Sequence, residues 1–142
     1  MTQTASTPVA ALPATTQFKP LRLVIAGALA LALNLAALAI GHLAGASLKV
    51  SAPEAIDWVS VTATTLGTML VGGAISWLLI RKWPRARGWA AWGGLIFGLA
   101  TMPMSFIAAA DLATGCTLAS MHMITSLAWL FAVKPSATTA SA

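Results

Sequence analysis

The stretch Arg81-Lys82-Trp83-Pro84-Arg85-Ala86-Arg87 separates two long apolar runs and carries four of the chain's eight basic residues. It holds no acidic residue, and its proline interrupts any helix that would otherwise continue. Basic residues resist crossing a bilayer and remain in cytoplasmic loops. This stretch therefore predicts a cytoplasmic hairpin that sets the orientation of both flanking runs, with Arg81, Lys82, Arg85 and Arg87 as the residues that determine the topology.

The composition indicates a membrane protein. Of the 142 residues, 58% are hydrophobic and only 8% are charged, whereas soluble domains carry about 25% charged residues. A bilayer core about 30 Å thick needs about 20 apolar residues per helix, so the apolar length suffices for about four spans. A net charge of +5 would suggest nucleic acid in a soluble protein. Here the charges flank apolar runs, so we expect the lipid bilayer and its anionic headgroups as partner, and no nucleic acid.

The apolar runs predict an all-α fold, an integral membrane up-down bundle of four transmembrane helices within residues 20–134. Short connections make neighbouring helices antiparallel. Two tails rich in Ala, Ser, Thr and Pro, residues 1–19 and 135–142, are expected to be disordered and cytoplasmic. The predicted spans cover about residues 21–43, 57–80, 88–110 and 117–133, and residues 111–116 are expected to form a tight external turn.

The remaining charges agree with this topology. Lys19, Arg22 and Lys134 fall on the side of the hairpin, and Lys49 alone falls on the other side with all three acidic residues. This asymmetry predicts a multi-pass protein with both termini in the cytoplasm. A cleaved signal peptide is the rival interpretation of the first span, because Ala44-Gly45-Ala46 fits a cleavage pattern. An apolar core about twice the usual 7–15 residues favours a retained helix.

Small residues predict where helices approach closely. The stretch from Gly94 to Gly98 is a GxxxG pattern, which places both glycines on a packing face within the bundle or in a homo-oligomer. Pro103 is expected to kink the third span and to free a backbone carbonyl one turn earlier. Trp129, near the end of the fourth span, is expected at the cytoplasmic interface.

Polar residues within the spans have two interpretations. Ser60, Thr64 and Thr68 share one helix face. They either line a polar path or bond the carbonyls of their own helix, as hydroxyls in helices often do. Asn34, near the middle of the first span, is expected to form a hydrogen bond across the bundle.

His122 is the strongest candidate for chemistry. It is predicted about 9 Å below the outer surface, at about 1.5 Å per residue. A nearby Asp111 would raise the pKa of the imidazole and let the pair pass protons or hold a cation. The alternative is a structural hydrogen bond to the carbonyl that Pro103 frees. Because polar groups in lipid need partners, we expect one cavity open to the outside, formed by His122, Asp111, Asn34, Thr64 and Ser105.

The chain offers little for catalysis. Its single cysteine, Cys116, excludes an internal disulfide and a cysteine-built metal site. It has no phosphate-binding glycine loop, HExxH or GxSxG motif, so we predict no enzyme, no catalytic residue, no cofactor and no metal. Four methionines near His122 would suit copper(I), but methionines also fill irregular gaps in a bundle. They are Met102, Met104, Met121 and Met123.

These features follow one another in a recognisable order. Asn34 lies in the first span, a Thr-rich second span ends in the basic hairpin, and Pro103 comes late in the third span. Asp111-Leu112-Ala113-Thr114 and Met121-His122 follow. Over about residues 21–133 this order resembles a bacterial family of small four-span membrane proteins of unknown function. The resemblance implies a four-span protein of the bacterial plasma membrane and gives weight to Asp111 and His122, but it supplies no activity.

Two functional hypotheses follow from the sequence. The first is a non-enzymatic role in packing or partner binding, with a homo-oligomer or another membrane protein as partner. The alternative is a small carrier or a proton or cation conduit that uses the polar pocket around His122 and Asp111. An enzyme or redox module is disfavoured by the lone cysteine and by the missing catalytic motifs.

Overall fold

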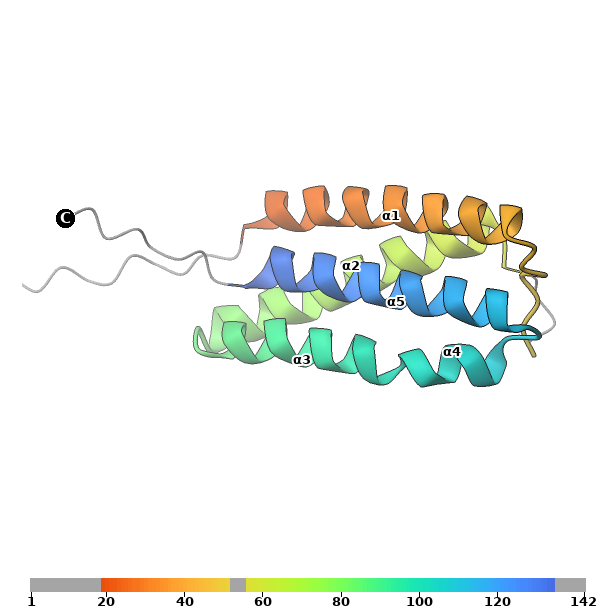
Figure 1. The fold of residues 1–142 in the computed structure, drawn as a ribbon. Coiled ribbons are helices and arrows are strands. Elements are labelled where there is room, and N and C mark those ends of the chain that lie inside the picture. Colours follow the sequence, from red (N-terminus) through yellow and green to blue (C-terminus); the bar gives the residue numbers. More distant parts are fainter. Residues whose placement is uncertain (1–18, 52–55, 135–142) are drawn as a thin grey trace, which may run out of the picture.

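The computed structural model describes residues 19–51 and 56–134, and it confirms the all-α four-span fold (Figure 1). Of the tails predicted at 1–19 and 135–142, all residues except Lys19 lie outside the described residues. The helices are α1 (Pro20–Leu43), α2 (Trp58–Lys82), α3 (Ala86–Ala100), α4 (Met102–Ala108) and α5 (Leu112–Val133). Helices α3 and α4 together form one span. Counted in this way, the described residues contain four spans that are long and apolar enough to cross a membrane.

The two ends of the bundle differ in charge. We call one the basic end, which carries Lys19, Arg22, Arg81, Lys82, Arg85, Arg87 and Lys134. We call the other the acidic end, where α2 and α5 begin at Asp57 and Asp111. Both described chain ends lie at the basic end, as an even number of spans requires.

Two aspartates start the helices at the acidic end. The Asp57 carboxylate accepts a hydrogen bond from the Ser60 backbone N–H at 2.7 Å, and the Ser60 hydroxyl accepts one from the Asp57 N–H at 3.0 Å. This reciprocal capping box satisfies two of the donors that a helix start leaves free. The Asp111 carboxylate accepts from the Thr114 backbone N–H at 2.7 Å and caps α5 in the same way.

The cap at Asp111 corrects the prediction for residues 111–116. They were expected to form a turn, but α5 begins at Leu112 and runs for 22 residues. Asp111 followed three residues later by Thr114 is a local helix-start signal, and it outweighs the turn preference of Gly115. Gly115 is needed in the helix for space, because a Cβ there would lie 2.7 Å from the Phe106 ring.

The third span is broken at Thr101, between α3 and α4 (Figure 1). Pro103 has no backbone N–H to continue the ladder, so the break that the sequence predicted is present. The Thr101 hydroxyl donates to the Gly98 carbonyl at 2.8 Å, which satisfies a carbonyl at the break. Both halves of the span, α3 and α4, still pack against α5, and the Gly98 carbonyl at the break is hydrogen-bonded.

Helix α5 is the centre of the bundle. It packs against α1 on one side and against α3 and α4 on the other, while α2 runs diagonally behind it (Figure 1). Helix α2 leans mainly on α1 and meets α3 near the hairpin. Among the described residues it makes no close contact with α4. The bundle is therefore open along one side, between α2 and the third span.

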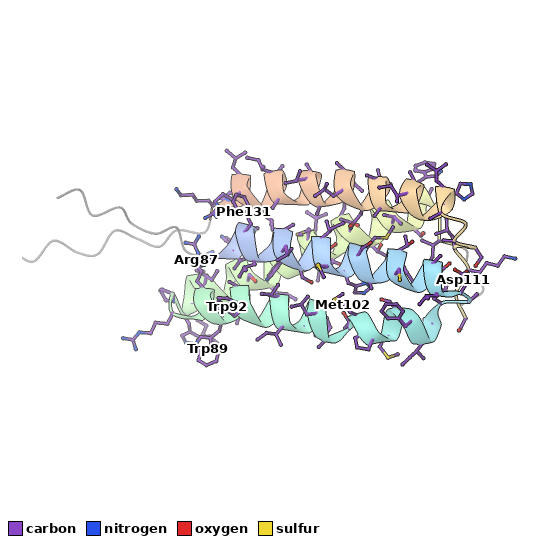
Figure 2. The ribbon with its side chains drawn as sticks, in the orientation of Figure 1. Arg87, Trp89, Trp92, Met102, Asp111 and Phe131 are labelled. Carbon is purple, nitrogen blue, oxygen red and sulfur yellow. The ribbon has the colours of Figure 1, made fainter. Side chains whose placement is uncertain are left out.

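Two arginines close the basic end. The Arg22 guanidinium donates to the carbonyls of Phe131 at 2.6 Å and Lys134 at 3.2 Å. The Arg87 side chain is buried and its Nε donates to the Val133 carbonyl at 2.9 Å (Figure 2). These cations bind the last carbonyls of α5, where the helix dipole is negative. Arg22 and Arg87 thus join α1 and α3 to the end of α5.

The outward faces of the helices are apolar. Large hydrophobic side chains are exposed along every span, including Leu29, Leu70, Ile96, Ile107 and Leu127. A soluble protein would place such contiguous apolar surface in a core or an interface. On four spans that can cross a membrane, this surface is suited to lipid.

Candidate functional site

A groove follows the open side of the bundle and is the candidate site. It has a volume of about 960 Å³ and lies between α2 on one side and α3 and α5 on the other. We call it the α2 groove. It reaches from Val50 and Ile56 at the acidic end to Trp129, and its lining is largely apolar. A volume of this size lies within the range of about 300–1,000 Å³ that is usual for small-molecule sites.

Trp129 closes the α2 groove toward the basic end. Its indole Nε1 donates to the Ala90 carbonyl at 3.0 Å, and its ring lies against Gly72 and Gly94. A Cβ at Gly72 would lie 2.9 Å from the ring, and one at Gly94 would overlap with it. The prediction that Trp129 marks the interface is wrong, because the structure buries it in the core. The glycines of α2 and α3 leave a space that only a large flat side chain fills.

Gly94 and Gly98 both face α5. A Cβ at Gly98 would overlap with the Ser126 hydroxyl, as one at Gly94 would with Trp129. The GxxxG face therefore packs within the bundle, which was one of the two predicted alternatives, and not in an oligomer interface. Ser126 donates to the His122 carbonyl at 2.6 Å, so its hydroxyl is held inside its own helix.

Asn34 is buried near the middle of α1, with 2% of its surface exposed. Its Nδ2 donates to the hydroxyls of Thr65 on α2 and Thr125 on α5, each at 3.0 Å. The predicted hydrogen bond across the bundle therefore has two partners. Its Oδ1 has no hydrogen-bond partner among the described residues. A buried polar atom without a partner costs about 1–3 kcal/mol, so this acceptor is an unusual feature next to a cavity.

His122 lines the α2 groove near the middle of α5. Its Nδ1 lies 2.9 Å from the Leu118 carbonyl and 3.5 Å from the Ser105 hydroxyl. The structural bond expected to a carbonyl freed by Pro103 is thus made within α5 instead. Ten residues of helix separate His122 from the start of α5, so it lies about 15 Å from that end, deeper than predicted. The error arose from placing the start of the helix five residues too late.

Asp111 does not meet His122, and this expected pairing is wrong. The two are eleven residues apart along one helix, about 16 Å at the helical rise, and Asp111 sits at the acidic end (Figure 2). Its carboxylate accepts hydrogen bonds from the Ser47 backbone N–H at 3.1 Å, from the Ser47 hydroxyl, and from the Thr114 hydroxyl at 2.8 Å. These hydrogen bonds, above all the one from the Ser47 hydroxyl, hold the pKa of Asp111 well below its usual range.

Asp111 therefore fastens the loop after α1 to the start of α5. Its neighbours strengthen the same junction, where the Ser51 N–H donates to the Ala108 carbonyl at 2.9 Å and the Ala110 N–H to the Lys49 carbonyl at 3.0 Å. A carboxylate with four donors is already satisfied and has little capacity for a further cation. Its role in this structure is to hold the acidic end together.

The other predicted pocket residues divide into two groups. Thr64 lines the α2 groove with Ser60 and Thr68, so the stripe lies along the cavity. The Thr64 hydroxyl nevertheless donates to the Ser60 carbonyl of its own helix at 2.7 Å. Ser105 is buried beside His122 on the α4 side and is not part of the groove lining.

Sequence reasoning missed Thr65 and Thr125, the two partners of Asn34. Thr125 lies three residues after His122 and thus on the same helix face. Helical periodicity could therefore have predicted Thr125 as a neighbour of His122. Thr65 carries no such signal, because its partner lies 31 residues away on another helix. Only the tilt of α2 against α1 brings Thr65 to Asn34.

Within the described residues, the methionines near His122 lie in different surroundings. Met104 and Met123 are exposed on the surface, whereas Met121 is buried at the groove. Within residues 19–51 and 56–134, no three His, Cys, Asp or Glu side chains lie close enough together to hold a metal ion. The methionines therefore do not converge on His122 as a copper(I) site would require.

The fold and the groove define a small four-span membrane protein with a ligand-sized cavity on one side. The chain belongs to a family of unknown function, DUF6069, which it matches over residues 14–139. A search of curated proteins gave no match, and a search of solved structures gave none either. The four-span architecture and the family agree with the resemblance noted in the sequence.

Proposed function

We propose that this protein is a non-enzymatic binding protein that holds a small membrane-soluble molecule in the α2 groove. The observation that carries the proposal is a cavity of about 960 Å³ beside Asn34, whose buried Oδ1 has no partner among the described residues. The groove opens on the lipid-facing side of the bundle and its volume lies within the usual range for small-molecule sites, so a membrane-soluble molecule could enter and fit there. The proposal keeps the non-enzymatic role of the first hypothesis from sequence, but it puts a small molecule where that hypothesis had a homo-oligomer or another membrane protein.

The depth of the polar groups supports a bound molecule. Asn34 and His122 both lie near the middle of their helices, at the centre of the bilayer if the spans cross it. Polar groups at that depth are costly unless they find a partner. A bound molecule would supply one, and the exposed apolar flanks of the groove would let it enter sideways from the lipid.

The conduit hypothesis loses its main support. It depended on a charged pair between Asp111 and His122, and these residues lie at different depths. Trp129 also blocks the α2 groove before it reaches the basic end. A path for protons or cations needs polar groups along its whole length, whereas the groove lining is largely apolar.

The distribution of charge supports an orientation as part of the proposal. Lys49 is the one basic residue of the chain outside the basic end, and the acidic residues of the described part all lie at the acidic end. By the positive-inside rule the basic end faces the cytoplasm of a bacterial plasma membrane. The α2 groove then belongs to the middle and the outer half of the bilayer.

Two matched glycines test the proposal. Gly67 lines the α2 groove and Gly93 faces outward, and a Cβ at either would have no atom within 4 Å. Gly67→Leu therefore adds an apolar side chain to the groove at a position where its Cβ meets no atom, and Gly93→Leu is its control. We expect a small molecule in organic extracts of purified wild-type protein and Gly93→Leu, detected by mass spectrometry, and much less of it from Gly67→Leu.

Two results would refute the proposal. Extracts with the same contents from all three proteins would mean that the groove holds no specific molecule. A dimer that becomes a monomer on Gly67→Leu, measured by native mass spectrometry, would mean that a second copy of the chain fills the groove instead.

A further inference from the structure

The hydrogen bond of His122 within α5 decides which chemistry its free nitrogen offers. Nδ1 lies 2.9 Å from the Leu118 carbonyl, which can only accept a hydrogen bond. A neutral imidazole carries one proton, so that proton is on Nδ1 and Nε2 keeps its lone pair. Nε2 has no hydrogen-bond partner among the described residues, and the ring lines the α2 groove. His122 therefore presents an acceptor.

Asn34 carries a second unpartnered acceptor beside the α2 groove, but this atom is buried. Its Nδ2 is used by Thr65 and Thr125, and its Oδ1 is left without a partner in the described part of the chain. Thr125, which Asn34 contacts at 3.0 Å, lies three residues from His122 on the same face of α5. The Oδ1 atom itself is closed off from the groove, so a ligand there reaches His122 Nε2 and not this second acceptor.

The lining of the α2 groove excludes a charged ligand. None of the described residues that line it is Asp, Glu, Lys or Arg. An ion near the middle of a bilayer needs a counter-charge or many polar ligands, and two neutral acceptors do not meet that need. A phospholipid could place only an acyl chain in the groove, because its charged head stays at the membrane surface, and an acyl chain has no donor for His122. The site fits a neutral molecule that donates hydrogen bonds.

We propose that the α2 groove binds a neutral amphiphile with a hydroxyl head, an alcohol or phenol carrying a hydrocarbon tail. The hydroxyl donates to His122 Nε2. The tail lies along the apolar side chains of Val61, Phe97 and Leu118. This inference rests on the proposed function, that the groove holds a small molecule, and adds the chemical class.

Nitrogen NMR of the two histidines tests the hydroxyl directly. The chain has only His42 and His122, and His42 is exposed in the last turn of α1. The full-length protein, labelled with ¹⁵N-histidine in lipid nanodiscs, is titrated with 4-hexylphenol and with its methyl ether, 4-hexylanisole. We expect the phenol to shift the Nε2 resonance of His122, assigned by its loss in H122Q, and to leave His42 unchanged.

The ether has nearly the same shape but no donor, so we expect it to bind about two- to tenfold more weakly, which corresponds to the loss of one hydrogen bond. Gly67→Leu should abolish the shift, and Gly93→Leu should keep it. If both probes bind equally and Gly67→Leu removes both, the hydroxyl class is refuted while the proposed function stands. If neither probe binds, the inference is refuted, and the extraction experiment decides the proposed function separately.

Discussion

The basic end of the bundle and the α2 groove treat polar groups in opposite ways. At the basic end, two buried or half-buried arginines donate to the carbonyls of Phe131, Val133 and Lys134, which a helix end would otherwise leave free. In the groove, two acceptors in the middle of the spans have no partner among the described residues. The first arrangement joins three helices. The second leaves capacity for a ligand.

Packing differs between the same two regions. Toward the basic end, Trp129 fills the space left by Gly72 and Gly94, so α2, α3 and α5 touch. Toward the acidic end, α2 diverges from α4 and the cavity opens. Helices α2, α3 and α5 thus pack tightly around Trp129, whereas α2 stands apart from α4 beside the groove in which we propose the ligand binds. Four predictions test this difference, in order of decreasing expected effect.

The largest effect is expected from replacing both Gly94 and Gly98 with Leu. The new side chains would overlap with Trp129 and Ser126, and overpacking a core costs about 1–3 kcal/mol at each site. Thermal unfolding in detergent, followed by circular dichroism, should show a large loss of stability. Gly93→Leu, next to Gly94 but facing open space, is the control and should unfold like the wild type. Equal stability of the double variant would place the GxxxG face away from α5.

Replacing Arg87 with Met should have the next largest effect. The substitution keeps most of the volume but removes a charged donor to the Val133 carbonyl in a buried position. Hydrogen bonds to charged groups contribute about 1.5–3 kcal/mol, so we expect a loss of stability of about that size. Arg85→Met removes an exposed arginine nearby and should change little. If the two variants unfold alike, Arg87 does not hold the end of α5.

Asp111→Asn should weaken the acidic end in a pH-dependent way. The donors from Ser47 and Thr114 keep the pKa of Asp111 in the folded protein below its unfolded value of about 3.9. The ionised carboxylate therefore stabilises the fold at neutral pH, and this contribution is lost as the pH falls below about 4. Unfolding temperatures of wild type and variant should differ most at pH 7 and converge in acid. A constant difference across this range would show that the charge is not involved.

Asn34→Leu should have the smallest effect on stability, within about 1 kcal/mol. The variant loses two hydrogen bonds, but it also removes the unpartnered Oδ1, and Thr65 and Thr125 can turn to carbonyls of their own helices. Chemical unfolding in mixed micelles measures the change. A loss as large as that of Arg87→Met would mean that Asn34 serves the fold rather than the groove.

Much of the fold could be predicted because its causes are local. Apolar length sets the number of spans, and the excess of basic residues at one end of each apolar run sets which helix ends lie together. Helix starts are also local, since Asp57 and Asp111 each bond a backbone N–H only three residues on. The start of α5 was misplaced because Gly115 was given more weight than the cap at Asp111.

The candidate site was predictable only in part. Asn34, Thr64 and His122 were expected in one cavity, and all three line the α2 groove. Asp111 was expected there because it is the nearest acid in sequence, but the same helix that carries His122 holds the two apart. Trp129 was predicted at the membrane interface because it lies near the end of its span. It is buried instead, because Gly72 of α2 and Gly94 of α3 leave space for its ring.

Four spans, their common ends, the packing role of the glycines and a set of polar residues in the spans could all be predicted from the chain alone. Hydropathy, helix caps and small residues act within one helix or its nearest connection, so each leaves a local pattern in the sequence. The folded bundle was needed to show that α2 tilts away from α4, that Asn34 joins Thr65 and Thr125 across 31 and 91 residues, and that two acceptors lie unpartnered among the described residues. These depend on how helices cross, and crossing is settled by side chains that are distant in sequence.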